Sequence, residues 1–346
     1  MISFQQHMND DKAAADQDLS DWANLHWEKL NPKISNGDYH AWSLVQNCNK
    51  MRREMKKKSV QKALKIPLSD VVAINLFFDS LVKSDYALLK EIIVCPPALF
   101  EALRSRLVQM MPEHIFYDST TGQTLFGLKL LTGLFKYKNY RKSRNCASFF
   151  SDNLKIGKSK CVYCNILDTD IIKKVSSGIP HEYKGYLDLD HFYDKSRNPF
   201  FALSFYNLIP CCTVCNRWAK LTKQFSLTTH INPFHESFED IYEFVYNAGN
   251  IRVVNKGAKP GDKTAEDLDI ETRTQHKVEE LKFQINYYTD YSVDAIVNTQ
   301  LREMFVKHFK PIIPLKKKDV LSLSRGKLYR DVFMNLDKNN GIFNFT

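Results

Sequence analysis

The residues of this chain best suited to chemistry lie between Asp188 and Lys220, where carboxylate, imidazole and amide side chains follow one another closely. Hydrolysis of a phosphodiester needs a base that makes hydroxide, and the ordinary pKa of histidine suits His191 to that role. Asp190 and Asn216 offer hard oxygen ligands of the kind that Mg²⁺ or Mn²⁺ prefers, and such a cation stabilises a leaving oxygen. Alternation of apolar and polar residues predicts a strand that ends at Asp190 and His191.

Two C-x-x-C pairs frame this region, Cys161 with Cys164 and Cys212 with Cys215. In a reducing compartment such pairs favour a metal site over disulfides, and two of them supply the four soft ligands of tetrahedral Zn²⁺. Cys211 offers a competing C-x-x-x-C spacing with Cys215, but Cys212 repeats the spacing of the first pair. A closed Cys₄ site has no open position for water, so we expect this zinc to staple a small insert rather than to catalyse.

The elements that must position these residues indicate an α+β chain. Helical periodicity predominates in residues 1–150, including a capped, buried helix from Ser69 to Val82. Residues 151–235 carry the cysteines and short strand-like runs. In residues 236–346 a predicted β-hairpin, Tyr242–Tyr246 with Ile251–Val254, precedes further helices. We therefore expect a helical N-terminal domain, a small central module and a mainly helical C-terminal region.

Positive charge is concentrated in two runs, although the formal net charge is only +10. The segment from Met51 to Lys65 contains seven basic residues and one acidic residue. The segment from Lys136 to Lys160 contains eight basic residues and one acidic residue. Such runs favour phosphate backbones as partners, with solvated lysine faces as the plain alternative. The longest apolar runs are too short to cross a bilayer and the N-terminus is polar, so we expect a cytoplasmic protein without a membrane partner.

The ordered set Cys-x-x-Cys, Asp-His, Asn-Leu-Ile-Pro and Cys-x-x-Cys-Asn, between Lys160 and Lys223, resembles the zinc-bound branch of the HNH endonuclease superfamily. The resemblance implies a zinc-stapled ββα-metal module embedded between mainly helical regions. It also implies a metal-dependent endonuclease that hydrolyses DNA and leaves a 5′-phosphate and a 3′-hydroxyl. RNA as a substrate and cleavage at a defined recognition site both stay open.

Carried over to this chain, the pattern implies that His191 is the general base, with Asp190 and Asn216 as ligands of a catalytic Mg²⁺ or Mn²⁺. Asn207 would fix the loop that orients His191, and the four cysteines would hold structural Zn²⁺. The residues expected to contact nucleic acid are Lys195, Lys220, Lys138, Arg141, Lys142 and Arg144. One departure is Asp194, since many relatives have proline before the lysine that corresponds to Lys195.

Two flanking segments, Ile231–Asp240 and Gln275–Leu281, are similar to parts of bacterial HNH proteins from anti-phage defence systems of the Septu and retron-associated types. That similarity implies an effector role beside an ATPase partner. The competing hypothesis is a zinc ribbon that binds nucleic acid without cutting it. The ribbon hypothesis predicts steep salt dependence of binding and no effect of His191→Ala.

Overall fold

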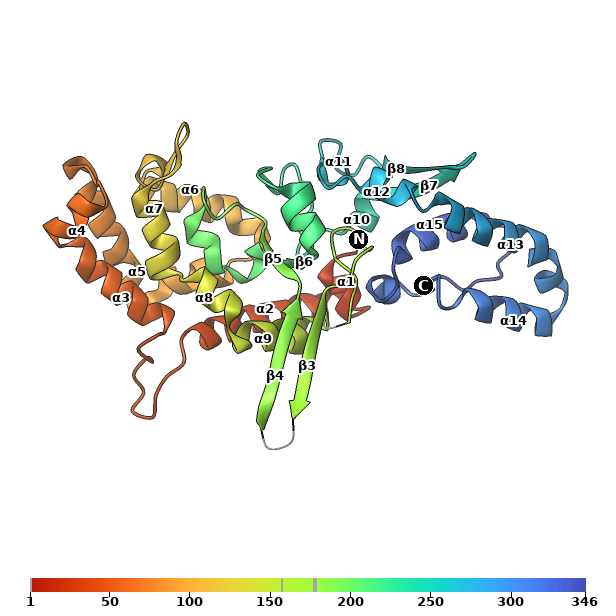
Figure 1. The fold of residues 1–346 in the computed structure, drawn as a ribbon, viewed down its shortest axis with the longest axis horizontal. Helices are drawn as coiled ribbons and strands as arrows, with labels where there is room; N and C mark the ends of the chain where they lie inside the picture. Colours follow the sequence, from red (N-terminus) through yellow and green to blue (C-terminus); the bar gives the residue numbers. More distant parts are fainter. Residues whose placement is uncertain (1, 157, 177–178) are drawn as a thin grey trace. The chain divides into compact units, whose positions relative to one another are not determined.

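The structure, a computed structural model, describes residues 2–156, 158–176 and 179–346 (Figure 1). The chain forms two compact units, and neither unit is continuous in sequence. Unit 1 consists of Met1–Asp16, Phe150–Asp188 and Pro210–Thr346, and unit 2 of Gln17–Phe149 and Leu189–Ile209. Each unit draws residues from more than one of the three segments 1–150, 151–235 and 236–346. Helices predominate in the described residues, with small two-stranded sheets, so the chain is α+β.

Unit 2 is built mainly from helices. Two helices are shared between the units by sequence, because α2 (Lys12–Leu30) begins in unit 1 and α9 (Arg144–Leu154) ends there. The other elements of unit 2 are α3 (Leu44–Met55), α4 (Lys58–Ala63), α5 (Leu68–Val94), η1 (Pro97–Leu99), α6 (Phe100–Met110), η2 (Glu113–Ile115), β1 (Tyr117–Asp118), β2 (Gly122–Gln123), α7 (Leu125–Lys129), η3 (Leu130–Leu134), α8 (Tyr137–Lys142), η4 (Pro199–Leu203) and η5 (Phe205–Asn207).

The core of unit 2 forms where α5 packs against α3. Phe77 and Phe78 of α5 are fully buried, and the Arg52 guanidinium on α3 lies 2.5 Å from the Asp79 carboxylate on α5. The helix predicted from Ser69 begins one residue earlier, at Leu68, because Pro67 is its N-cap. It is also buried on one face only, since Val72 is 64% exposed.

Unit 1 holds the remaining elements, and β5 (Asp188–His191) and β6 (Leu208–Cys211) carry the chain from one unit to the other. These two strands pair with each other. The other elements of unit 1 are α1 (Phe4–Met8), β3 (Asp170–Ser176), β4 (Ile179–Tyr186), η6 (Cys215–Lys220), α10 (Phe238–Ile241), β7 (Tyr242–Asn247), β8 (Asn250–Asn255), α11 (Thr264–Asp267), α12 (Ile270–Gln275), α13 (Val278–Val297), α14 (Thr299–Phe309), η7 (Lys317–Ser322) and α15 (Gly326–Leu336).

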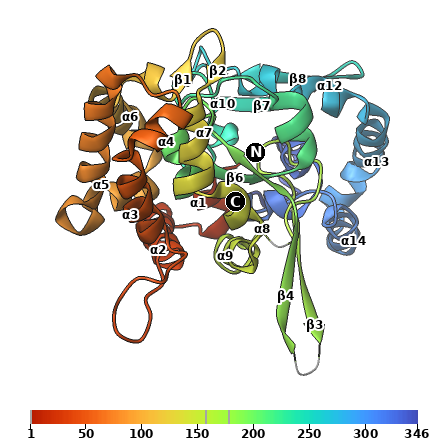
Figure 2. The same ribbon diagram turned by 60° about the vertical axis from the view of Figure 1, so that its left-hand side comes forward.

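Two antiparallel hairpins stand out in unit 1 (Figure 2). Strands β7 and β8 pair where a hairpin is predicted, and Ala248 and Gly249 at its turn both have positive φ. That conformation matches the twist of a two-residue hairpin turn and favours glycine. Strands β3 and β4 form a longer ribbon that the sequence analysis does not identify.

The C-terminal part of unit 1 is held by an aromatic core. Helices α13 and α14 pack against each other, and α15 packs on β7. The ring of Tyr288 lies 5.6 Å from that of Phe305 and 5.7 Å from that of Phe333, measured between centroids. Among the described residues, the helices include none with the length and apolar character needed to span a membrane.

Candidate active site and metal centre

Asp190 and His191 stand at the end of β5, as the alternation predicts. Both side chains are buried, with exposed fractions of 4% and 5%. Pairing continues past the strand, because the Phe192 N–H donates to the carbonyl of Asn207 at 3.0 Å. Buried polar side chains need hydrogen-bond partners, so the fold must supply such partners to Asp190 and His191 at this strand end.

The imidazole of His191 is held from two sides within unit 2. Its Nε2 lies 3.1 Å from the carbonyl oxygen of Ala202, and the ring of Tyr137 meets its ring edge-on with a centroid distance of 4.3 Å. The Tyr137 hydroxyl in turn donates to the carbonyl of Leu189 at 3.0 Å. A carbonyl can only accept, so Nε2 carries the proton in the neutral ring and Nδ1 is the basic nitrogen.

Asn207 ties together the segment that follows His191. Its Oδ1 accepts the backbone N–H of Tyr193 at 2.7 Å, while its Nδ2 donates to the carbonyls of Tyr193 at 3.2 Å and Phe201 at 3.0 Å. The side chain is fully buried. All three bonds reach backbone groups on either side of the loop, so this one amide fixes the loop's course between His191 and Ala202.

The four cysteines of the two C-x-x-C pairs form one cluster in unit 1. Their sulfur atoms all lie within 4.8 Å of one another, and all four residues are buried. The Cys161–Cys215 and Cys164–Cys212 sulfur separations are 3.8 and 3.9 Å. A tetrahedron with zinc–sulfur bonds of about 2.3 Å has edges of about 3.8 Å, so these side chains can hold a zinc ion. Cys211 is buried as well, but it is not part of the cluster.

The cysteines of the cluster shift in opposite directions. Burial raises the pKa of Cys161 well above its usual range, whereas at Cys164 the hydrogen bonds of the neighbouring thiols outweigh burial and hold the pKa well below that range. Arg273, on α12, donates from Nη1 to the sulfur of Cys215 at 3.3 Å and to the carbonyl of Leu268 at 3.2 Å. A guanidinium beside four thiolates offsets part of the charge that a Zn²⁺–Cys₄ centre retains. Arg273 is not among the site residues predicted from the sequence.

Asn216 lies directly after the second C-x-x-C pair and is half-buried. Its Nδ2 donates to the Asp188 carboxylate at 3.1 Å, and Arg217 makes two contacts of 2.8 Å with the same carboxylate. Two parallel bonds from a guanidinium to a carboxylate are a strong, directional pair. Asp188 raises the pKa of Arg217 through these hydrogen bonds. Asp188 is a residue that the sequence analysis does not select, although it stands two residues before Asp190.

Lys220 is only 3% exposed, which differs from the solvent-facing position expected of a lysine that contacts DNA. Its ammonium lies 4.6 Å from the ring centroid of Phe225, and that ring stacks on His230 at 3.8 Å. Burial of this kind is typical of a cation–π contact that supports structure.

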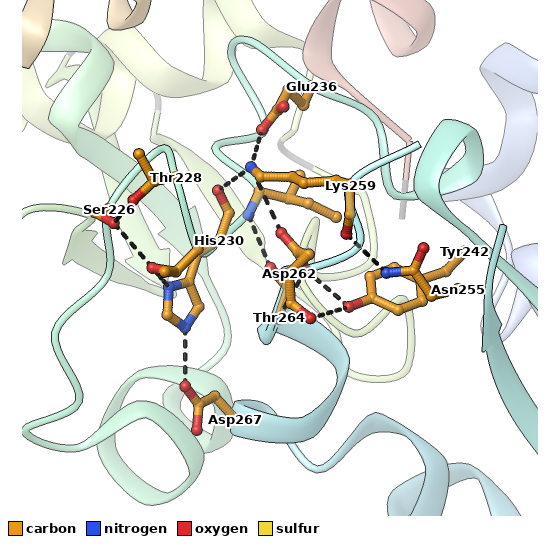
Figure 3. Close-up of polar contacts among 12 residues, drawn as sticks. Ser226, Thr228, His230, Glu236, Tyr242, Asn255, Lys259, Asp262, Thr264 and Asp267 are labelled. Carbon is orange, nitrogen blue, oxygen red and sulfur yellow. Dashed lines mark hydrogen bonds and ion pairs between the residues drawn. The ribbon is translucent and has the colours of Figure 1, made fainter. Parts of the chain in front are cut away.

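The segment after the second C-x-x-C pair is anchored by a polar network (Figure 3). His230 is bonded through Nε2 to the Asp267 carboxylate at 2.9 Å and through Nδ1 to the Thr229 hydroxyl at 2.8 Å. Burial lowers the pKa of His230, and the contact with Asp267 opposes that shift. Lys259 adds a 2.6 Å ion pair with Glu236. These bonds connect the chain after the cysteine cluster to α11.

The remaining residues predicted to contact nucleic acid lie in unit 2. Lys138, Lys142 and Arg144 are exposed, whereas Arg141 and Lys195 are half-buried. The Lys195 ammonium lies 5.7 Å from the centroid of the Tyr137 ring, which itself contacts His191.

The predicted site residues are divided between the two units. Asp190, His191 and Asn207 belong to unit 2, while the cysteine cluster, Asn216 and Lys220 belong to unit 1. Comparison with protein-family models, with curated proteins and with solved structures found no match.

Proposed function

We propose that this chain is a metal-dependent endonuclease of the HNH type that hydrolyses phosphodiester bonds of DNA. In this proposal His191 is the general base, and Asp190 with Asn216 binds the catalytic Mg²⁺ or Mn²⁺. The cysteine cluster holds a structural Zn²⁺ and takes no part in the reaction.

The observation that carries the proposal is the hydrogen bond between His191 Nε2 and the carbonyl of Ala202. It selects the tautomer in which Nδ1 can take a proton from water, which is what a general base requires. Asn207 donates to the carbonyl of Phe201, the residue before Ala202. The Ala202 carbonyl that His191 contacts is therefore itself held in place. A buried histidine with a defined tautomer and a braced acceptor is better suited to proton transfer than a surface histidine.

The proposed cation ligands have the appropriate chemistry. Asp190 provides a carboxylate, and the bond from Asn216 Nδ2 to Asp188 turns the amide so that Oδ1 is its available ligand atom. When bound, the cation supplies positive charge to a phosphate oxygen and to the leaving oxygen. His191 then has the single task of removing a proton from the attacking water.

A plasmid-cleavage assay tests this function. The purified protein is incubated with supercoiled DNA in Mg²⁺, in Mn²⁺ or in EDTA, beside His191→Ala and the control His235→Ala, an exposed histidine. We expect metal-dependent nicking or linearisation by the wild type and by His235→Ala, and a loss of at least about 100-fold in His191→Ala. DNA binding measured in EDTA should be similar in all three proteins.

Two outcomes contradict the proposal. If the His191→Ala variant still cleaves DNA, the general base is a different residue. Tight binding by all three proteins with no cleavage in either cation favours the zinc ribbon that binds nucleic acid without cutting it. The role as a defence effector beside an ATPase stays a prediction, and activity that appears only when such a partner is added would support it.

A further inference from the structure

A groove in unit 1 runs between the C-terminal end of α9 and strand β3. Its volume is about 670 Å³, and its polar lining includes Lys155, Lys158 and Lys173 together with Ser151 and Asp170. All three lysines are exposed. They come from two separate stretches of the chain, so the fold, and not the sequence alone, brings them to one groove.

The charge of this lining is unbalanced. Among the residues that the structure describes, none of these three lysines takes part in a salt bridge, and Asp170 is the one carboxylate that lines the groove. Lys160, which lies close by in the sequence but does not line the groove, is by contrast paired with Asp168 at 2.5 Å. Three like charges facing one groove create a positive potential that an anionic partner relieves.

Lys155 adopts a backbone conformation that a lysine rarely has. It follows the last residue of α9 with φ of +54°, the left-handed position at a helix C-terminus where glycine is usually found. A Cβ at this positive φ is strained relative to glycine. This lysine therefore occupies a position where a smaller residue would be more favourable for the backbone.

The β3–β4 ribbon adds lysines whose partners are tyrosine rings. The register pairs Lys173 with Tyr183, and the Lys173 ammonium lies 5.7 Å from the Tyr183 ring centroid. The Lys184 ammonium lies 5.0 Å from the ring of Tyr186, its neighbour two residues along β4. Proteins that bind single strands use open aromatic faces to stack bases. Here a face of each ring already carries an ammonium, which favours contacts with phosphates over contacts with bases.

The ribbon and α9 are connected at the groove. The Tyr183 hydroxyl lies 3.4 Å from the Asp152 carboxylate of α9, so a side chain of the ribbon reaches the helix that forms the other wall. A two-stranded ribbon of this kind is one of the elements narrow enough to lie in the major groove of B-form DNA. Lysines on both of its faces would then meet phosphates on either side.

We propose that this groove and the β3–β4 ribbon bind the phosphate backbone of double-stranded DNA, with Lys155, Lys158 and Lys173 as the principal contacts. The inference rests on the proposed nuclease function and assigns its substrate contact to unit 1. These three lysines are separate from Lys138, Arg141, Lys142 and Arg144 of unit 2. Contacts of this kind depend on the charge of the phosphates, so they do not distinguish one base sequence from another.

Fluorescence anisotropy with a labelled DNA duplex, recorded in EDTA over a range of salt concentrations, tests this assignment. The test variant is Lys155→Gln/Lys158→Gln/Lys173→Gln. The matched control, Lys307→Gln/Lys310→Gln/Lys338→Gln, removes three exposed lysines of the same unit. We expect the test variant to bind about tenfold or more weakly near 0.1 M salt, and its slope of log K against log salt to fall by about two to three. The control should change affinity less than about twofold.

A variant with arginine at the three positions should restore binding, because arginine keeps the charge. Equal behaviour of the test and control variants would overturn the assignment, as would a loss seen with a single-stranded probe but not with the duplex.

Binding in EDTA does not depend on catalysis. A protein that never cleaves but loses duplex affinity in the test variant therefore contradicts the nuclease proposal alone, while unchanged affinity with intact cleavage contradicts the groove alone.

Discussion

The side-chain amide of Asn207 binds both backbone polar groups of Tyr193, accepting from its N–H at 2.7 Å and donating to its carbonyl at 3.2 Å. An asparagine in this arrangement acts like a neighbouring strand for one residue, and its third bond, to the Phe201 carbonyl, extends the brace across the loop. The acceptor that orients His191 is the carbonyl of the next residue, Ala202. The position of the proposed base thus depends on a side chain that binds backbone groups of the loop and not the imidazole itself.

Asn207→Ala should weaken both stability and cleavage. The substitution leaves a buried N–H and two carbonyls without their partner, so we expect the free energy of unfolding to fall by about 2–3 kcal/mol. Cleavage should fall by about tenfold or more, with a smaller change in duplex affinity. Urea titration and single-turnover cleavage measure the two effects. Asn36→Ala, on an exposed loop, is the control, and equal cleavage by both variants would refute a positioning role.

Purified protein should contain about one zinc ion per chain, because one Cys₄ cluster is found among the residues that the structure describes. Removal of the ion by a strong chelator should lower the melting temperature of the protein, because metal binding contributes to the folding free energy. Cys161→Ser should lose most of the metal. Cys211→Ala is the matched control, since Cys211 is buried but lies outside the cluster. Metal analysis of both variants decides the ligand set, and zinc loss in Cys211→Ala would contradict it.

Arg273→Met should weaken zinc binding by about 10- to 100-fold without changing the four ligands. The guanidinium donates to the Cys215 sulfur, and the thiolates raise its pKa despite the opposing effect of burial. Competition with a chromogenic chelator measures the affinity. Arg252→Met, an exposed arginine of β8 paired with Glu271, should leave that affinity unchanged. If the two variants bind zinc equally, Arg273 contributes to packing rather than to the electrostatics of the centre.

Acidification should destabilise unit 2 through His26. Burial lowers the pKa of His26 to about 4, while its Nε2 lies 2.9 Å from the carbonyl of Leu203. The unfolded chain binds this proton near pH 6.5 and the folded chain does not, so stability present above pH 6.5 is lost as the pH falls toward 4. The full contribution is about 3 kcal/mol.

The comparison with His26→Gln isolates this contribution. The variant should be less stable than the wild type at pH 7.5, and the difference in free energy of unfolding should narrow by about 2–3 kcal/mol between pH 7 and pH 4.5. Protonation of other groups affects both proteins alike and cancels in the difference. Urea titrations at several pH values give the result, and a difference that stays constant with pH would show that His26 titrates normally.

The cysteine set could be predicted from sequence because a C-x-x-C turn is a local feature whose spacing already fits one metal ion. The strand ending at His191 and the β7–β8 turn could also be predicted, since alternation and the Asn247–Asn250 turn act over a few residues. The tertiary contacts of these groups could not be predicted from the sequence. Arg273 reaches Cys215 from a helix far along the chain, and Asp188 meets Arg217 across the same insert. The exposed face of α5 could not be predicted either, because apolar residues at helical spacing do not indicate whether another element packs over them.

The interleaving of the two units constrains how this protein can be synthesised and dissected. Unit 2 is complete once Ile209 has left the ribosome, whereas unit 1 needs both its first sixteen residues and the chain up to its last helices. The early segment of unit 1 must therefore wait unpaired while more than half of the chain is translated. A cut at residue 150 or 235 separates segments of the same unit, so a fragment bounded there lacks part of its own core. Cleavage by a protease in an exposed loop, followed by tests of whether the pieces stay together, would be more informative about this protein than expression of its segments in isolation.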